Sequence, residues 1–208
     1  MTPTHRLLAA SAVVGCVFVS SACSFAGHSG RAATLVHPSG KIGNLQIGSS
    51  GARAVIASTG RPDADRRGVE YDGTPYRALG YDCSAKPSDD SFPVLETQSG
   101  RHGPSCKTVF WINLRTRRLG DFYTISPHYE ESHGVRIGMA TATAERILHQ
   151  RVYVGCEENL RVGAITVAFT GGVGRTSRGS SGIRLIGGHV YAFAAHGGRS
   201  DVGIFDCL

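Results

Sequence analysis

The chain has 208 residues, of which 41% are hydrophobic and 18% are charged, and this balance excludes an intrinsically disordered protein. The formal net charge is +6, but the densest basic group, Arg115, Arg117 and Arg118, has no interleaved aromatic residues, which disfavours a nucleic-acid-binding surface. The 28 Gly and 8 Pro favour a globular body with many turns and short strands.

Residues 1–22 predict a cleavable signal peptide. Arg6 supplies the positive charge, Leu7–Val19 form an apolar run of 13 residues, and the small residues Ser20–Ala22 precede Cys23. This run is shorter than the roughly 18 residues expected of a membrane-spanning helix. We therefore expect an exported protein.

Cys23 is the candidate lipidation site, because Val19–Cys23 resembles a bacterial lipobox, in which small residues precede the modified cysteine. Cys16 lies in a similar local sequence, but choosing it would leave apolar Val17–Val19 on the mature protein. Ordinary cleavage after Ala22 is the alternative, and it would leave Cys23 as an unpaired thiol. With lipidation, residues 23–41 are expected to form a Gly- and Ser-rich tether.

Four further cysteines are expected to form disulfides in an oxidising compartment, namely Cys83, Cys106, Cys156 and Cys207. Four cysteines allow three pairings. Locality favours Cys83 with Cys106, across the polar insertion 84–105, and Cys156 with Cys207. Because no pair has CxxC spacing, we do not expect the thiols to bind a metal.

Two segments, 43–60 and 132–148, are alike at a spacing of 90 residues, and each predicts a short strand, a glycine turn and a helix. Leu45, Ile47, Gly48 and Ala54 align with Val135, Ile137, Gly138 and Ala144. Strands are expected at 77–83, 106–113 and 119–126, and then at 152–156, 164–170, 183–186 and 190–195. The expected fold class is α+β, with helices on one face of an antiparallel sheet and two tandem repeats, residues 42–127 and 128–208.

Three segments carry a resemblance to a known family: Val135–Met139 with its following helix, Phe169–Gly172, and Gly187–Tyr191. Together they resemble the helix-plus-hairpin repeat of SmpA/OmlA-type envelope lipoproteins and of the β-lactamase inhibitory protein. The resemblance implies a non-enzymatic, sheet-based interaction module with tandem copies, and it assigns no contact residues.

No convincing catalytic or ligand-binding motif is found. His128, Glu130, Glu131 and His133 lie within six residues but lack HExxH spacing, so a solvated loop is expected rather than a metal site. Gly171–Ser177 lacks the Gly-Lys-Ser/Thr end of a phosphate-binding loop and is expected to be a basic hairpin tip. Ser200 and Asp201 near His196 are triad residue types without a Gly-x-Ser-x-Gly elbow.

Phe110 and Trp111 are adjacent in an expected strand and must point to opposite faces, which predicts an exposed aromatic side chain for partner binding unless both faces are covered. The sequence thus predicts a lipid-anchored protein-binding module of the bacterial cell envelope. Its partner would be an envelope or extracellular protein, and no enzymatic activity, cofactor or metal is expected. The alternatives are a secreted enzyme inhibitor that uses the 84–105 loop, and a secreted hydrolase.

Overall fold

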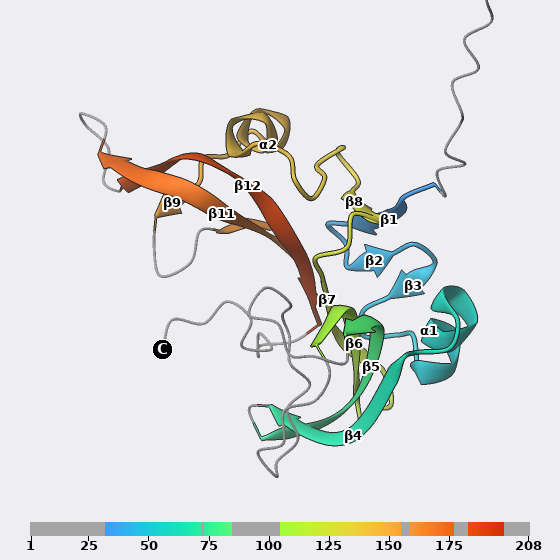
Figure 1. Ribbon diagram of the computed structural model, residues 1–208. Helices are drawn as coiled ribbons and strands as arrows, with labels where there is room; N and C mark the ends of the chain where they lie inside the picture. Colours follow the sequence, from blue (N-terminus) through green and yellow to red (C-terminus); the bar gives the residue numbers. More distant parts are fainter. Residues whose placement is uncertain (1–31, 72, 85–104, 155–158, 177–182, 198–208) are drawn as a thin grey trace, which may run out of the picture. The chain divides into compact units, whose positions relative to one another are not determined.

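The computed structural model describes residues 32–71, 73–84, 105–154, 159–176 and 183–197, all within a unit that begins at Ala32 (Figure 1). These residues contain twelve strands, in two sheets, and two short helices. None of the described helices is long and apolar enough to cross a membrane.

The smaller sheet has four strands in the order β3-β2-β1-β8. Their bounds are β1 Thr34–His37, β2 Lys41–Ile42, β3 Leu45–Gln46 and β8 Tyr129–Glu131. Strands β1 and β8 are parallel, and Val36 in β1 is fully buried. Residues 34–41, which the sequence assigned to the tether, are therefore part of the folded body.

The larger sheet follows the order β10-β11-β12-β7-β6-β5-β4, with β9 also paired to β12. The bounds are β4 Ala64–Tyr71, β5 Thr74–Ser84, β6 Ser105–Asn113, β7 Leu119–Thr124, β9 Tyr153–Val154, β10 Asn159–Val162, β11 Ile165–Thr176 and β12 Ile183–His196. Every described pairing in this sheet is antiparallel. Two runs of consecutive strands, β4–β7 and β10–β12, join where Phe193 of β12 pairs with Thr124 of β7.

The main hydrophobic core lies between the two sheets and the helices α1 (Ala52–Thr59) and α2 (Thr141–Leu148). The small sheet contributes Val36, Ile42 and Leu45, the helices contribute Val55 and Ala144, and the large sheet contributes Leu79, Phe110, Phe122, Phe193 and others. Each helix has eight residues, only about two turns, so burial of one apolar face rather than helix propensity stabilises it.

A second buried cluster lies on the opposite face of the large sheet. Its members are Ala64, Tyr76, Ala78, Cys106, Val109, Trp111, Tyr123, Ala168, Ala192 and Ala194. Phe110 belongs to the first cluster and Trp111 to the second, and both are buried. The alternation expected for these neighbours is confirmed, but neither ring is exposed, so the aromatic docking patch predicted there is wrong.

The expected α+β fold with two tandem repeats is also wrong, because the protein is mostly β-structure with two short helices and a separate small sheet. The small sheet includes strands from both sides of the expected repeat boundary, because β1 lies before residue 127 and β8 lies after residue 128. The aligned helical positions are not equivalent either: Ala54 is exposed, whereas Ala144 is fully buried. Strands of two residues, such as β2 and β3, are too short for hydrophobic periodicity to reveal.

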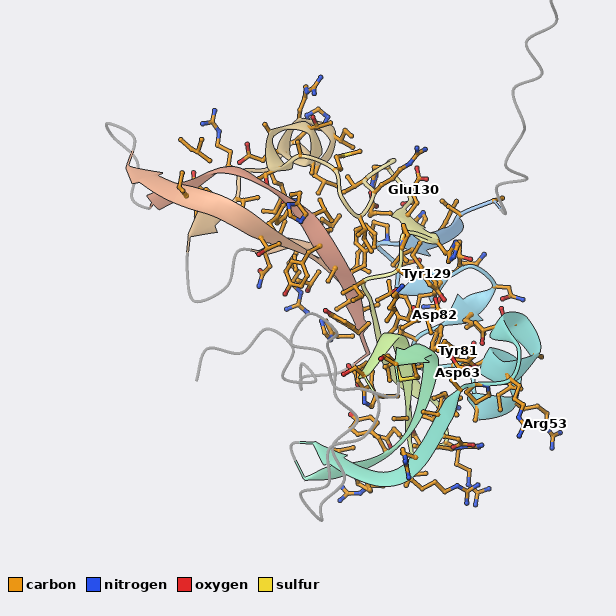
Figure 2. All side chains as sticks on the ribbon, in the orientation of Figure 1. Arg53, Asp63, Tyr81, Asp82, Tyr129 and Glu130 are labelled. Carbon is orange, nitrogen blue, oxygen red and sulfur yellow. A yellow bond between two sulfur atoms is a disulfide. The ribbon has the colours of Figure 1, made fainter. Side chains whose placement is uncertain are left out.

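A row of four aromatic rings crosses the core face of the sheet. Tyr81, Phe110, Phe122 and Tyr129 are in successive contact, with ring centroids 5.8, 5.0 and 5.2 Å apart. Tyr81 and Tyr129 form its two ends (Figure 2). Burial raises the pKa of Tyr129 to about 12 and also raises the pKa of Tyr81. The row thus ties β5, β6 and β7 to β8 of the small sheet.

Candidate binding surface

The Cys83–Cys106 disulfide expected from the sequence is confirmed. The two residues are direct cross-strand partners in β5 and β6, and their Sγ atoms are bonded. Cys106 is fully buried in the second cluster. Cys23, Cys156 and Cys207 lie outside the described residues, so lipidation and the second bridge remain predictions.

Gly80 makes space for this bridge from within the same strand. It lies three residues before Cys83 in β5. A Cβ atom on Gly80 would overlap Sγ of Cys106 and lie 3.0 Å from Sγ of Cys83. The position therefore has no room for a side chain while the disulfide is formed.

The four residues considered as metal ligands do not converge. Glu130 forms an ion pair with Arg136, with Oε2 of Glu130 2.8 Å from Nε of Arg136. Glu131 is fully buried, and its carboxylate accepts hydrogen bonds from the His133 backbone N–H at 2.8 Å and the Ser132 hydroxyl at 3.1 Å, while its Oε1 lies 2.7 Å from His133 Nδ1. No group of three or more metal-ligating side chains occurs among the described residues. Glu131 therefore fixes the turn that leads into α2, and the stretch is less solvated than the sequence suggested.

His196 and Asp121 form a buried contact between neighbouring strands. They pair directly across β12 and β7, and Nδ1 of His196 lies 3.4 Å from Oδ1 of Asp121. A carboxylate beside an imidazole is one element of a hydrolase site, which also needs a positioned nucleophile. Ser200 and Asp201 lie outside the described residues. The contact by itself thus assigns no reaction.

Among the described residues, three exposed large hydrophobic side chains lie where β9, β11 and the first half of β12 extend beyond β7 (Figure 1). Val173 of β11 pairs with Ile186 of β12, and Tyr153 of β9 pairs with Arg184, two residues before Ile186. Because alternate strand residues share a face, Tyr153, Val173 and Ile186 lie on the same face. Their exposed fractions are 46, 67 and 39%. We call these three residues the distal patch.

The opposite face of the same strands is buried against α2. Leu185, next to Ile186, belongs to the main core, and its N–H donates to the Val152 carbonyl at 3.0 Å. The Val152 N–H in turn donates to Oε1 of Glu145 in α2 at 2.9 Å. The distal patch is therefore the outer side of strands whose inner side is fixed by core packing and hydrogen bonds.

The register of the β11–β12 ladder shifts once before the patch, between Ala168 and Phe169. Beyond it Thr170 pairs with His189 and Gly172 with Gly187, so Gly171 and Gly188 lie opposite each other in an unbroken register. Gly188 has φ of +74°, and a Cβ there would lie 2.5 Å from the Thr170 carbonyl oxygen. Residues Gly171–Thr176 belong to strand β11, so the hairpin tip expected there is wrong for these six residues; Ser177 lies outside the described residues.

The comparisons with known proteins assign no family. No protein-family model matches the chain, and no curated protein matches it. Among solved structures, the crystal structure of the uncharacterized protein yfeY from Escherichia coli is similar at 14% sequence identity and a TM-score of 0.46. The match covers 79% of this chain and 99% of that chain. Similarity at this level carries no argument about function.

Sequence reasoning did not single out the distal patch. Val173 stands in a glycine-rich run that is typical of a loop, and Tyr153 lies in a strand of only two residues. The one available signal was the short strand expected at 183–186, in which Ile186 alternates with Leu185. Which of those two faces is covered depends on α2, far earlier in the chain, and local sequence does not contain that information.

Proposed function

We propose that the chain is an exported, lipid-anchored protein of the bacterial cell envelope that binds another envelope protein through the distal patch, without catalysis. The leader and Cys23 support the location. The observation that carries the binding role is the clustering of exposed apolar side chains on three adjacent strands.

Five large hydrophobic residues are exposed in the described part of the chain, and three of them form the distal patch. Single exposed apolar residues are ordinary on protein surfaces, whereas several that gather on one face support an interaction site. Leu35 and Leu114 belong to other parts of the fold, on β1 and after β6. The core-backed strands also suit binding, because a surface that is already ordered loses little conformational entropy when a partner docks.

The binding role is tested by site-specific photo-crosslinking in intact cells that produce the full chain. A photoreactive residue at position 173 is expected to crosslink to one envelope protein, and the substitution Ile186→Glu should abolish that product by placing a charge in the buried interface. A photoreactive residue at Arg53, exposed on α1, is the matched control and should give no such product (Figure 2).

Equal crosslinking from positions 173 and 53, or a product at position 173 that survives Ile186→Glu, contradicts the proposal. A product with the mass of two copies of this chain also contradicts it, because it would identify the patch as a self-association surface. Thermal unfolding of the Ile186→Glu variant must match that of the parent protein for the comparison to count.

The anchor is tested separately by labelling cells with palmitate. Incorporation into the parent protein and its loss in the Cys23→Ser variant are expected. Label that persists in the variant would place the anchor elsewhere, and the absence of label from the parent would favour ordinary cleavage after Ala22.

A further inference from the structure

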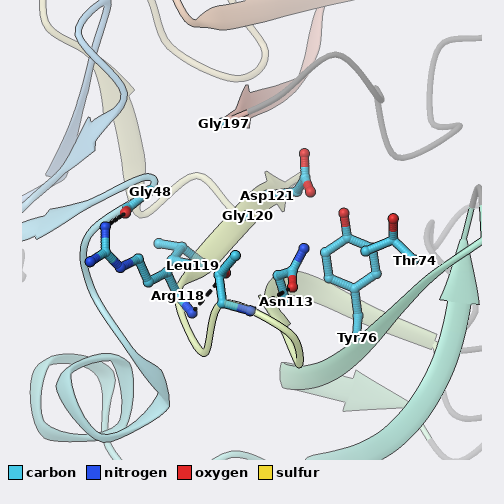
Figure 3. A pocket seen from close by; sticks show the side chains of 10 residues that line it. Gly48, Thr74, Tyr76, Asn113, Arg118, Leu119, Gly120, Asp121 and Gly197 are labelled. Carbon is cyan, nitrogen blue, oxygen red and sulfur yellow. Dashed lines mark hydrogen bonds between the residues drawn. The ribbon is translucent and has the colours of Figure 1, made fainter.

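A cavity of about 550 Å³ lies where the β6–β7 turn meets the start of β5 and the end of β12 (Figure 3). Its polar lining includes Thr74, Tyr76, Asn113, Arg118 and Asp121, and Leu119 adds apolar surface. The volume is within the range of roughly 300–1,000 Å³ that is usual for small-molecule sites.

Hydrogen bonds between side chains and backbone groups hold the walls of this cavity in place. Oδ1 of Asn113 accepts hydrogen bonds from the N–H groups of Arg115 and Thr116, at 2.9 and 3.0 Å, which defines the turn. Arg118 donates from Nη1 to the Gly48 carbonyl at 3.2 Å. A Cβ on Gly120 would lie 3.1 Å from the Tyr76 ring. A ligand would therefore meet a preformed surface.

The lining combines hydrogen-bond donors and acceptors without a dominant charge. The Thr74 hydroxyl can donate or accept, and the Asn113 amide nitrogen donates. Tyr76 and Asp121 are each only 3% exposed, and Oδ1 of Asp121 lies 3.4 Å from Nδ1 of His196, so these two residues can add a contact only beside the partners that they already have. Arg118 is the one cationic residue among the described residues of the lining, so the cavity lacks the concentration of positive charge that a phosphate site requires. Hydroxyl groups of a ligand can donate and accept at once, which suits this mixed lining.

We propose that this cavity binds a small neutral saccharide, with the hydroxyls of Thr74 and Tyr76 among its contacts. The proposal is independent of the distal patch, because the two surfaces share no residue. Either one can therefore fail without the other.

The test is an NMR titration of the purified protein with maltotriose, with N,N′,N″-triacetylchitotriose and, as an anionic control, with inorganic phosphate. At least one saccharide is expected to shift the backbone amides of Thr74 and of residues 113–121 saturably, and phosphate should not. Thr74→Val keeps the side-chain shape and removes the hydroxyl, so the dissociation constant should rise roughly three- to tenfold. Thr170→Val, on an exposed part of β11, is the control and should leave it unchanged.

The proposal is overturned if neither saccharide shifts these amides, if phosphate shifts them more strongly, or if Thr74→Val binds as well as the parent protein. Should Thr74→Val lose its dispersed amide spectrum, Tyr76→Phe, which removes only a hydroxyl, replaces it with the same expected weakening.

Discussion

Gly80 and the Cys83–Cys106 disulfide occupy adjoining space, because a Cβ on Gly80 would overlap Sγ of Cys106. We expect Gly80→Ala to lower the free energy of unfolding by about 1–3 kcal/mol, as overpacking of a buried site usually does. Urea unfolding measures the change. In a Cys83→Ala/Cys106→Ala background the overlapping sulfur atoms are absent, so the same substitution should cost less; an equal cost in both backgrounds would assign the strain to the backbone instead.

Tyr129 makes the stability sensitive to alkaline pH. Its pKa is raised by burial from 10.0 to about 12, so the unfolded chain loses the phenolic proton at a lower pH than the folded protein does. Stability associated with Tyr129 is therefore complete below pH 10 and declines as the pH rises toward 12. Tyr129→Phe should make this alkaline decline shallower, measured as the melting temperature against pH. An identical decline in the variant would assign the effect to other groups, such as Tyr123, whose pKa burial also raises.

At the level of single residues, sequence reasoning identified the alternation of Phe110 and Trp111 correctly and misjudged their exposure. Alternation is a local property of a strand. Exposure depends on which parts of the chain cover each face, and the residues that bury Phe110 include Leu79 and Phe122, brought together by strand pairing.

At the level of elements, β4 and β5 are joined by a two-point ion pair between Asp65 and Arg77, with N–O distances of 2.8 and 2.6 Å. The hydrogen bond from Arg77 lowers the pKa of Asp65 below its ordinary value of 3.8. The pair is partly exposed, so Asp65→Asn should lower stability at neutral pH by less than about 1 kcal/mol.

The sign of its pH dependence follows from the lowered pKa. The stabilisation is present above pH 3.8 and is lost as the pH falls through the lower pKa of the folded state, so variant and parent should converge in strong acid. Chemical unfolding at several pH values tests this. The free energies of unfolding of variant and parent should also converge at high salt, because salt screens the ion pair. A difference in stability that persists in acid would rule out the ion pair as its cause.

Leu185 and Ile186 are neighbours on β12 that face opposite environments, one buried and one in the distal patch. Leu185→Ala should cost about 2–5 kcal/mol of stability, because it leaves a cavity in the core. Ile186→Ala should change stability by no more than about 0.5 kcal/mol, as surface substitutions usually do. Urea unfolding of the two variants makes the comparison, and similar losses would show that Ile186 is covered in the folded protein.

Strands rich in β-branched and aromatic residues were predictable from the sequence, and the short or charged strands were not. Strands β5, β6 and β7 each contain or overlap an expected strand, because their apolar runs are long enough to recognise. Strand β4 was missed, since its sequence ADRRGVEY lacks an alternating apolar pattern. Strand β1 was taken for tether, because four residues between Gly- and Ser-rich sequence carry little periodic signal.

At the level of the whole molecule, the expected repeats failed because similar local sequence does not require similar packing. Segments 43–60 and 132–148 both form a helix after a glycine turn, but Val55 is the fully buried residue of α1, whereas Ala144 is fully buried in α2. The small sheet is assembled from residues far apart in the sequence, and it covers part of the main core. No local sequence pattern predicts this sheet.

The continuous path of strands from β10 to β4 predicts that the described body unfolds as one cooperative unit. Trp111, the only tryptophan of the chain, lies in the second cluster, whereas circular dichroism reports on the strands of both sheets. Both signals should give the same urea midpoint. Because Cys83–Cys106 closes a separation of 23 residues, Cys83→Ala/Cys106→Ala should lower the free energy of unfolding by about 3 kcal/mol and move both midpoints together. If only the urea midpoint of the Trp111 signal moved, the two buried clusters would unfold separately. The shared sheet would then not make their unfolding cooperative.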